Sequence, residues 1–171
     1  MGESALLRFY RHAGADPRGR SLRDIRAFGV DRLEGTHDFI QWLFPLPEAS
    51  GANPQAPRLA PEDIEAFGRE ATLREELRRS LDVMLRFYGL GRRATGEATV
   101  IARGPGYAAR SADWLDRPHN FLRLSRILRS LALLGCAPEA AALLACLEDV
   151  CRENEAAIGP ETLRYWRRAA G

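Results

Sequence analysis

The chain has 171 residues, of which 25 are basic and 23 acidic, so its net charge is only +2; all of the basic residues are arginine. Proteins dedicated to nucleic acids or to acidic membranes usually have a one-sided charge or a dense basic run, so we do not expect either partner. A hydrophobic content of 46% and a charged content of 28% are typical of a globular domain and exclude a largely disordered chain.

The first half of the chain predicts short helices separated by glycine and proline. The expected helices cover residues 4–11, 21–28, a stretch from 31 or 36 to 44, and 62–70. Ser21 and Asp24 have the spacing of a capping box, in which each side chain satisfies a first-turn amide. Prolines recur between residues 45 and 61 and predict a long loop, and loops of this length in small domains are often functional.

The second half predicts longer helices. One is expected to end at Tyr88, because large apolar residues recur every three and four positions before it. Residues 91–117 predict an irregular segment in which Thr99, Val100 and Ile101 could form a short strand or an extended turn. Further helices are expected from Pro118 to Leu134, from Pro138 and from Pro160. The whole pattern predicts an all-α fold, a single compact domain over residues 1–171 with about seven or eight packed helices.

Two segments combine polar groups with many large apolar residues. In the first, residues 36–46, a helix would place His37 and Gln41 one turn apart on one face, with Asp38 beside them. The opposite side would carry the large residues Phe39, Ile40, Trp42 and Leu43. Two interpretations remain open: a core helix whose polar groups are hydrogen bonded, or the wall of a pocket.

The second segment, residues 118–131, predicts a helix with a cationic ribbon beside an apolar face. At about 100° per residue, one arc of the helix gathers His119, Arg123, Arg126 and Ser130. Arginine offers planar, bidentate donors to a carboxylate or a phosphate, so the ribbon could hold an anion. The alternative is a solvated face whose arginines pair with nearby acidic residues.

An enzymatic alternative rests on histidine and aspartate. His12, the pair His37-Asp38 and a later aspartate (Asp82, Asp113 or Asp149) loosely imitate the helical metal-dependent phosphohydrolases with paired His-Asp ligands. In such enzymes imidazoles and carboxylates converge on a metal that activates water. The residues after Asp38 depart from that pattern, and neither a nucleophile motif nor a glycine-rich phosphate loop is present. We therefore predict no catalytic residue, no metal ligand and no cofactor.

Location and source can also be predicted. No window offers the roughly 18 uncharged apolar residues that a membrane-spanning helix needs. The N-terminal residues do not follow the pattern of a secretory signal, so a cytoplasmic protein is expected. Arginine in place of lysine, with many Ala, Gly and Pro, indicates a GC-rich genome and predicts a bacterial source.

The three cysteines lack the paired spacing of a zinc site and are expected to be reduced thiols: Cys136, Cys146 and Cys151.

The same two segments resemble a known family. The run from His37 to Pro45, followed by Ser50 and Asn53, resembles the signature of the opioid growth factor receptor conserved domain, and so does the run His119-Asn120-Phe121-Leu122-Arg123. The resemblance spans essentially the whole chain and departs from the family between residues 92 and 117. It implies a non-enzymatic receptor or binding module. Animal members are described as receptors for an enkephalin-type pentapeptide that restrain cell growth and are associated with the nucleus, a ligand not expected for a bacterial protein.

These observations lead to a ligand-binding hypothesis. We expect the two segments to border a common cleft that binds a peptide or a small anionic ligand, with an arginine taking a carboxylate. The candidate ligand-binding residues are His37, Asp38, Gln41, Trp42, His119, Asn120, Arg123 and Arg126. A purely structural or oligomerising helical domain remains the other alternative, and the sequence does not predict the oligomeric state.

Overall fold

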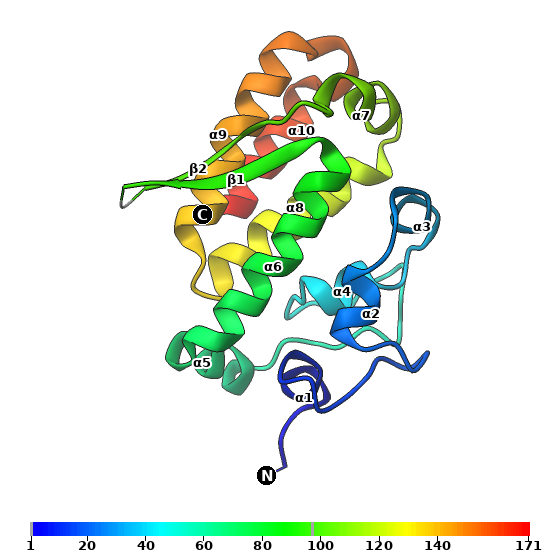
Figure 1. Ribbon diagram of the computed structural model, residues 1–171, viewed down its shortest axis with the longest axis vertical. Helices are drawn as coiled ribbons and strands as arrows, with labels where there is room; N and C mark the ends of the chain where they lie inside the picture. Colours follow the sequence, from blue (N-terminus) through cyan, green and yellow to red (C-terminus); the bar gives the residue numbers. More distant parts are fainter. Residues whose placement is uncertain (1, 97) are drawn as a thin grey trace. The chain divides into compact units, whose positions relative to one another are not determined.

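The computed structural model describes residues 2–96 and 98–171, which form ten helices and one two-stranded sheet (Figure 1). These residues form two compact units, the first ending at Ser80 and the second comprising Leu81–Gly171. The boundary between the units falls inside the longest helix, α6 (Ala71–Tyr88). Each unit is described by itself below.

The first unit contains short helices. They are α1 (Ala5–Tyr10), α2 (Leu22–Arg26), α3 (Val30–Gly35), α4 (Ile40–Leu43) and α5 (Pro61–Arg69), followed by the start of α6. Of these, α1, α2 and α5 begin within one residue of the predicted start. Ser4 caps α1, and the capping box of Ser21 and Asp24 is present at the start of α2. Pro61 occupies the first turn of α5, where its missing N–H costs no helical hydrogen bond. Local sequence signals therefore set these helix starts.

Aromatic side chains form the core of the first unit. Phe9 packs against Trp42 with ring centroids 5.1 Å apart, and Tyr10 packs edge-on against Phe67 at 4.9 Å. The Tyr10 hydroxyl donates to the carbonyl of Leu43, so the polar tip of this buried ring is satisfied. These contacts fix α1 against α4 and α5.

The expected single helix ending near residue 44 is wrong, because the structure divides it into α3 and α4. Thr36 has an extended backbone, with φ −107° and ψ 127°, and α4 begins only at Ile40. Between the two helices, the carbonyl of Asp38 accepts from Asn53 and its carboxylate lies against two arginines. Contacts with distant segments thus override the local helical preference of this stretch.

The proline-rich loop after α4 is present as predicted. Leu46 and Arg58 form an isolated parallel bridge across it, and the Leu59 N–H donates to the Leu46 carbonyl at 3.0 Å. Within the loop, the Ser50 hydroxyl accepts from the N–H of Asn53 at 3.2 Å. These bonds order the loop without regular secondary structure.

The second unit contains the end of α6 and then β1 (Leu90–Thr95), β2 (Ala98–Arg103), α7 (Tyr107–Trp114), α8 (His119–Leu133), α9 (Ala137–Glu153) and α10 (Glu155–Ala170). Helices α8, α9 and α10 pack against one another, and β2 packs against α9 (Figure 1). Helix α10 is broken at Gly159, which has φ 73°, so Pro160 opens its second part as predicted. The Trp166 indole N–H donates to the carbonyl of Phe121 at 3.1 Å and joins α10 to α8.

Two predictions for this unit are wrong. The fold is mostly helical but not strictly all-α, because β1 and β2 form an antiparallel hairpin. Residues 91–96 and 98–117 are mostly regular rather than irregular, since they hold most of this hairpin and helix α7. The β-branched residues Thr99, Val100 and Ile101 lie in β2, which confirms the short strand expected there. The number of helices in the described residues is ten rather than seven or eight.

Candidate functional site

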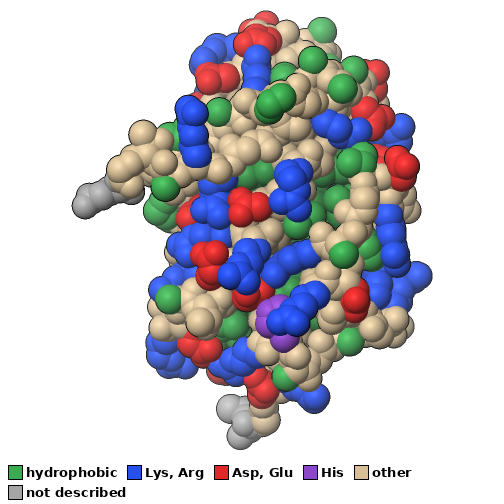
Figure 2. Space-filling model, viewed as in Figure 1, with side chains coloured by type: hydrophobic (Ala, Val, Ile, Leu, Met, Phe, Trp, Pro, Cys, Tyr) green, Lys and Arg blue, Asp and Glu red, His purple; other side chains and the backbone are tan. Residues whose placement is uncertain are grey.

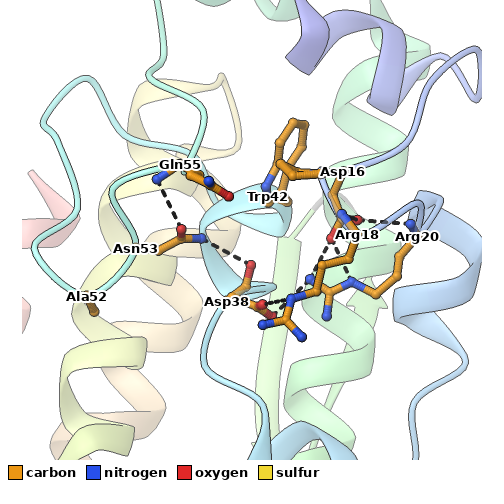
Figure 3. Close-up of a pocket in the computed structure, with 9 residues that line it drawn as sticks. Asp16, Arg18, Arg20, Asp38, Trp42, Ala52, Asn53 and Gln55 are labelled. Atoms are coloured by element: carbon orange, nitrogen blue, oxygen red, sulfur yellow. Dashed lines mark hydrogen bonds and ion pairs between the residues drawn. The ribbon is translucent and has the colours of Figure 1, made fainter.

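A pocket of about 220 Å³ lies in the first unit (Figure 3). Its lining residues come from the segment after α1, from the start of α4 and from the proline-rich loop: Asp16, Pro17, Arg18, Arg20, Asp38, Trp42, Ala52, Asn53 and Gln55. Asp38 and Trp42 belong to the predicted ligand-binding set. The structure therefore places two residues of this segment at a pocket, together with residues that the sequence did not single out.

One wall is organised around the carboxylate of Asp16. Oδ1 of Asp16 accepts from the backbone N–H groups of Arg18 and Arg20, each at 2.9 Å, and Oδ2 accepts from Nε of Arg20 at 2.6 Å. The Asp16 side chain is fully buried. A buried carboxylate is tolerated only when it is paired and hydrogen bonded, and both conditions are met here. The result is a rigid turn from Asp16 to Arg20.

Arg20 connects this turn to Asp38. Its Nη2 lies 2.9 Å from Asp38 Oδ1, and its side chain is only 12% exposed. Burial opposes the charged form of Arg20, but its hydrogen bonds and charge interactions with Asp16 and Asp38 outweigh burial and raise its pKa. Arg20 is therefore a permanent cation fixed between two carboxylates.

Arg18 differs from Arg20 in exposure. Its Nε lies 2.5 Å from Asp38 Oδ2, yet 71% of its side chain is exposed. Figure 3 shows Asp38 with the two arginines on one side and Asn53 on the other. Asp38 thus has a largely shielded partner, Arg20, and an exposed partner, Arg18, one on each carboxylate oxygen.

The proline-rich loop supplies amide groups to the other wall. Nδ2 of Asn53 donates to the carbonyl of Asp38 at 3.4 Å, and Oδ1 of Asn53 accepts from the N–H of Gln55 at 3.2 Å. The indole of Trp42, only 4% exposed, contributes apolar surface to the pocket. The site therefore combines fixed charges, amides and an aromatic ring.

His37 and Gln41 lie beside this pocket in sequence but do not line it. His37 precedes α4, is exposed, and accepts from Gln41 Nε2 at its backbone carbonyl, at 3.3 Å. Gln41 is buried and its Nε2 also lies 3.5 Å from the Ser50 hydroxyl. The prediction that both side chains share one helical face is wrong, because α4 begins after His37.

The second predicted segment lies on α8, in the other unit. Ser130 has no exposed surface and Arg123 is 5% exposed, so the ribbon is not a fully solvated helix face. Nη1 of Arg123 lies 3.5 Å from Oδ1 of Asn120. Residues His119 and Arg126 are half-buried. A cleft shared by the two segments stays a prediction.

The residues of the enzymatic alternative have other partners. Nε2 of His12 lies 3.1 Å from Oε2 of Glu76, which also accepts from Arg26, and Asp38 lies against Arg18 and Arg20. Among residues 2–96 and 98–171, no three His, Cys, Asp or Glu side chains are grouped to hold a metal ion. The three cysteines are buried and form no disulfide, and burial raises the pKa of Cys146 to about 11. The described residues therefore offer no ligand set for that alternative.

A helix that crosses a bilayer must be long and apolar. Among the helices in residues 2–96 and 98–171, none has the length and apolar character required to cross it.

Comparison with known proteins covers nearly the whole chain. Residues 2–170 match the family described as the opioid growth factor receptor (OGFr) conserved region. The opioid growth factor receptor of Homo sapiens is 38% identical over 138 residues, which cover 78% of this chain and 20% of that protein. The opioid growth factor receptor-like protein 1 of Xenopus tropicalis is 34% identical over 133 residues, which cover 75% of this chain and 25% of that protein.

The chain thus spans about a fifth to a quarter of the length of these relatives. Both are animal proteins, so they do not support the expected bacterial source, which stays a prediction. No solved structure matches the chain. On the match over residues 2–170 and the identity to the receptors, the chain belongs to the opioid growth factor receptor conserved-region family.

Proposed function

We propose that this chain is a non-enzymatic recognition module that holds one polar group of a peptide or small ligand in the pocket of the first unit. The observation that carries the proposal is the position of Asp38 and Trp42, which belong to the family-like segment and both line the pocket. Functional residues are commonly placed on loops held by a rigid scaffold, and the lining loops here are held by hydrogen bonds.

The size of the pocket limits what it can hold. Pockets for drug-sized ligands have volumes of about 300–1,000 Å³. A volume of about 220 Å³ suits one side chain or one end of a ligand, so the rest of a peptide would lie outside the pocket. Recognition of a single group by fixed charges fits a binding module, because arginine already pairs with both carboxylates of the lining: Arg20 with Asp16, and Arg18 and Arg20 with Asp38.

The names of the relatives indicate which ligands should be tested for binding. Those compared above are named as receptors or receptor-like proteins, which favours binding of a ligand. The activity of the whole relatives remains a proposal for this chain, which covers only part of their length. We accordingly propose two probes: an enkephalin-type pentapeptide, and a panel of capped tripeptides that differ in the central residue. We also propose that the protein is cytoplasmic and comes from a bacterium. The base composition of its gene tests the proposed source.

Tryptophan indole signals in a ¹H–¹⁵N NMR spectrum test the proposal directly. Trp42 lines the pocket, whereas the buried indole groups of Trp114 and Trp166 donate to the carbonyls of Tyr88 and Phe121. The W42F variant assigns the signal of Trp42. We expect at least one probe to move the Trp42 signal in a saturable way while the other two signals stay in place. Probes that leave Trp42 unmoved at millimolar concentration, or that move all three signals equally, contradict the proposal.

A further inference from the structure

A guanidinium group of the protein itself, that of Arg18, lies at the pocket against the carboxylate of Asp38. Nε of Arg18 lies 2.5 Å from Asp38 Oδ2, on a side chain that is 71% exposed. We propose that Arg18 stands in the place of a ligand's guanidinium group, so that the pocket is a site for an arginine side chain of a peptide and Arg18 closes it when no ligand is bound. This inference rests on the proposed function and names the group that the pocket recognises.

Asp38 is built as a fixed acceptor. Its backbone carbonyl accepts from Asn53 Nδ2, and its Oδ1 lies 2.9 Å from Nη2 of Arg20. The side chain of Asp38 is half-buried rather than freely solvated. Since both the backbone and one carboxylate oxygen are held, Oδ2 presents a preformed site to a cation, and preformed sites lose little conformational entropy on binding.

The two arginines at Asp38 are not equivalent. Arg20 cannot leave, because it neutralises the fully buried Asp16 through Nε and Nη2. Removing one partner of a buried ion pair leaves an uncompensated charge, which is strongly unfavourable. Arg18 donates its backbone N–H to Asp16, while its exposed side chain is held by the ion pair with Asp38 and can rotate into solvent when that pair breaks. An exposed ion pair of this kind is weak and exchangeable.

Charge balance selects a cation as the ligand. With Arg18 in place, the carboxylates of Asp16 and Asp38 are matched by two guanidinium groups. When Arg18 swings away, the site carries one net negative charge, and an incoming cation restores neutrality. An anion would instead have to displace the held carboxylate of Asp38, which costs the bond to Arg20.

The remaining lining favours a guanidinium over an ammonium. A guanidinium is planar, donates along one edge and stacks on aromatic rings, whereas an ammonium is a compact, strongly hydrated charge. The indole of Trp42 and the amides of Asn53 and Gln55 complete the pocket around Asp38 (Figure 3). Its volume of about 220 Å³ suits one side chain.

The test compares capped amino-acid probes by the Trp42 indole signal. The probes are the N-acetyl amides of arginine, lysine and norleucine, together with acetate at matched ionic strength. The proteins are the wild type, R18A, R18A/D38N and the matched control R69A, whose arginine is 72% exposed and pairs with Glu65 away from the pocket. The Trp42 signal without probe reports whether the first unit of each variant remains folded, and the signals of Trp114 and Trp166 report the second unit.

We expect R18A to bind the arginine probe about two- to sixfold more tightly than the wild type, the gain expected when an exposed ion pair no longer competes. R69A should bind like the wild type, and folded R18A/D38N should bind about tenfold or more weakly than R18A. The norleucine probe should not bind, and the lysine probe should bind more weakly than arginine.

Weaker or unchanged arginine binding in R18A overturns the inference, as does equal binding of norleucine or tighter binding of lysine. Acetate that binds the wild type and not R18A would make Arg18 an anion-binding residue and also overturns it. If the peptide panel moves the Trp42 signal but the arginine probe does not, the recognition module stands and the guanidinium site fails. If no probe moves it, both fail.

Discussion

Arg20 holds the carboxylate of Asp16 inside the first unit, with Nε donating to Oδ2 over 2.6 Å and the Asp16 side chain fully buried. The same carboxylate accepts two backbone N–H groups. Side-chain and backbone contacts to this carboxylate therefore shape one wall of the pocket together. We expect the conformation of the wall to depend on the Asp16–Arg20 ion pair.

The Asp16→Asn substitution tests that dependence. An amide cannot replace the charge that Arg20 needs, so we expect the free energy of unfolding to fall by about 3 kcal/mol. Urea unfolding of D16N measures the change, with R69A as a control for an exposed pair, which should lose less than about 1 kcal/mol. A D16N protein as stable as R69A would show that the buried pair does not organise the wall.

The capping box at the start of α2 predicts a second stability effect. The Asp24 N–H donates to the Ser21 hydroxyl at 3.2 Å, and the Ser21 N–H donates to the Asp24 carboxylate at 2.8 Å. Replacing Ser21 by alanine removes the side-chain acceptor and should cost about 1 kcal/mol, whereas glycine should cost only a few tenths. Denaturant unfolding with an unchanged m-value checks this order, and the reverse order would argue against the cap.

Gly89 predicts a backbone effect in the second unit. It has φ +77°, and a Cβ there would lie 2.6 Å from the Cα of Tyr107. Gly96 has φ +62°, and no atom among the described residues would lie within 4 Å of its Cβ. We expect G96A to lose about 1 kcal/mol from the left-handed backbone alone and G89A about 3 kcal/mol from strain plus the clash. Equal thermal stability of the two variants would contradict the close approach of Gly89 and Tyr107.

Glu76 predicts the sign of a pH effect. Burial alone would raise its pKa, but the hydrogen bond and charge of Arg26, with the charges of His12 and Arg79, lower it overall. A carboxyl whose folded pKa lies below its unfolded value near 4.5 stabilises the fold above that value and loses this contribution as pH falls. The stability difference between wild type and E76Q should therefore be largest near neutral pH.

Urea unfolding from about pH 7 to about pH 3 measures this difference. It should shrink as the solution is acidified past the unfolded pKa of the carboxyl. A difference that stays constant or grows in acid would mean that the ionised Glu76 is not the group that Arg26 stabilises.

Helix starts could be predicted from the sequence because their signals are local. Ser4, Ser21 and Pro61 act through bonds to residues a few positions away, and each marks a helix start in the structure. The break between α3 and α4 could not be predicted in this way. It depends on contacts of Asp38 with Arg20 and Asn53, which lie 18 and 15 positions away.

The pocket could be predicted only in part. Trp42 and Asp38 were singled out because they stand in a short segment rich in aromatic and polar residues. Arg18 and Arg20 carried no distinguishing signal among 25 arginines, because what sets them apart is a buried carboxylate at Asp16. The turn-forming sequence Asp16-Pro17-Arg18-Gly19 was the available clue, since an aspartate at the start of a turn often accepts from the backbone ahead of it.

The central claim is that the pocket beside Asp38 and Trp42 binds the polar group of a ligand. A titration of the isotope-labelled wild-type protein with the peptide probes, followed at the indole N–H signals, tests it most directly. We predict a saturable shift of the Trp42 signal that is absent for Trp114 and Trp166, whose indoles are engaged in buried hydrogen bonds. A Trp42 signal that stays fixed with every probe would contradict the account.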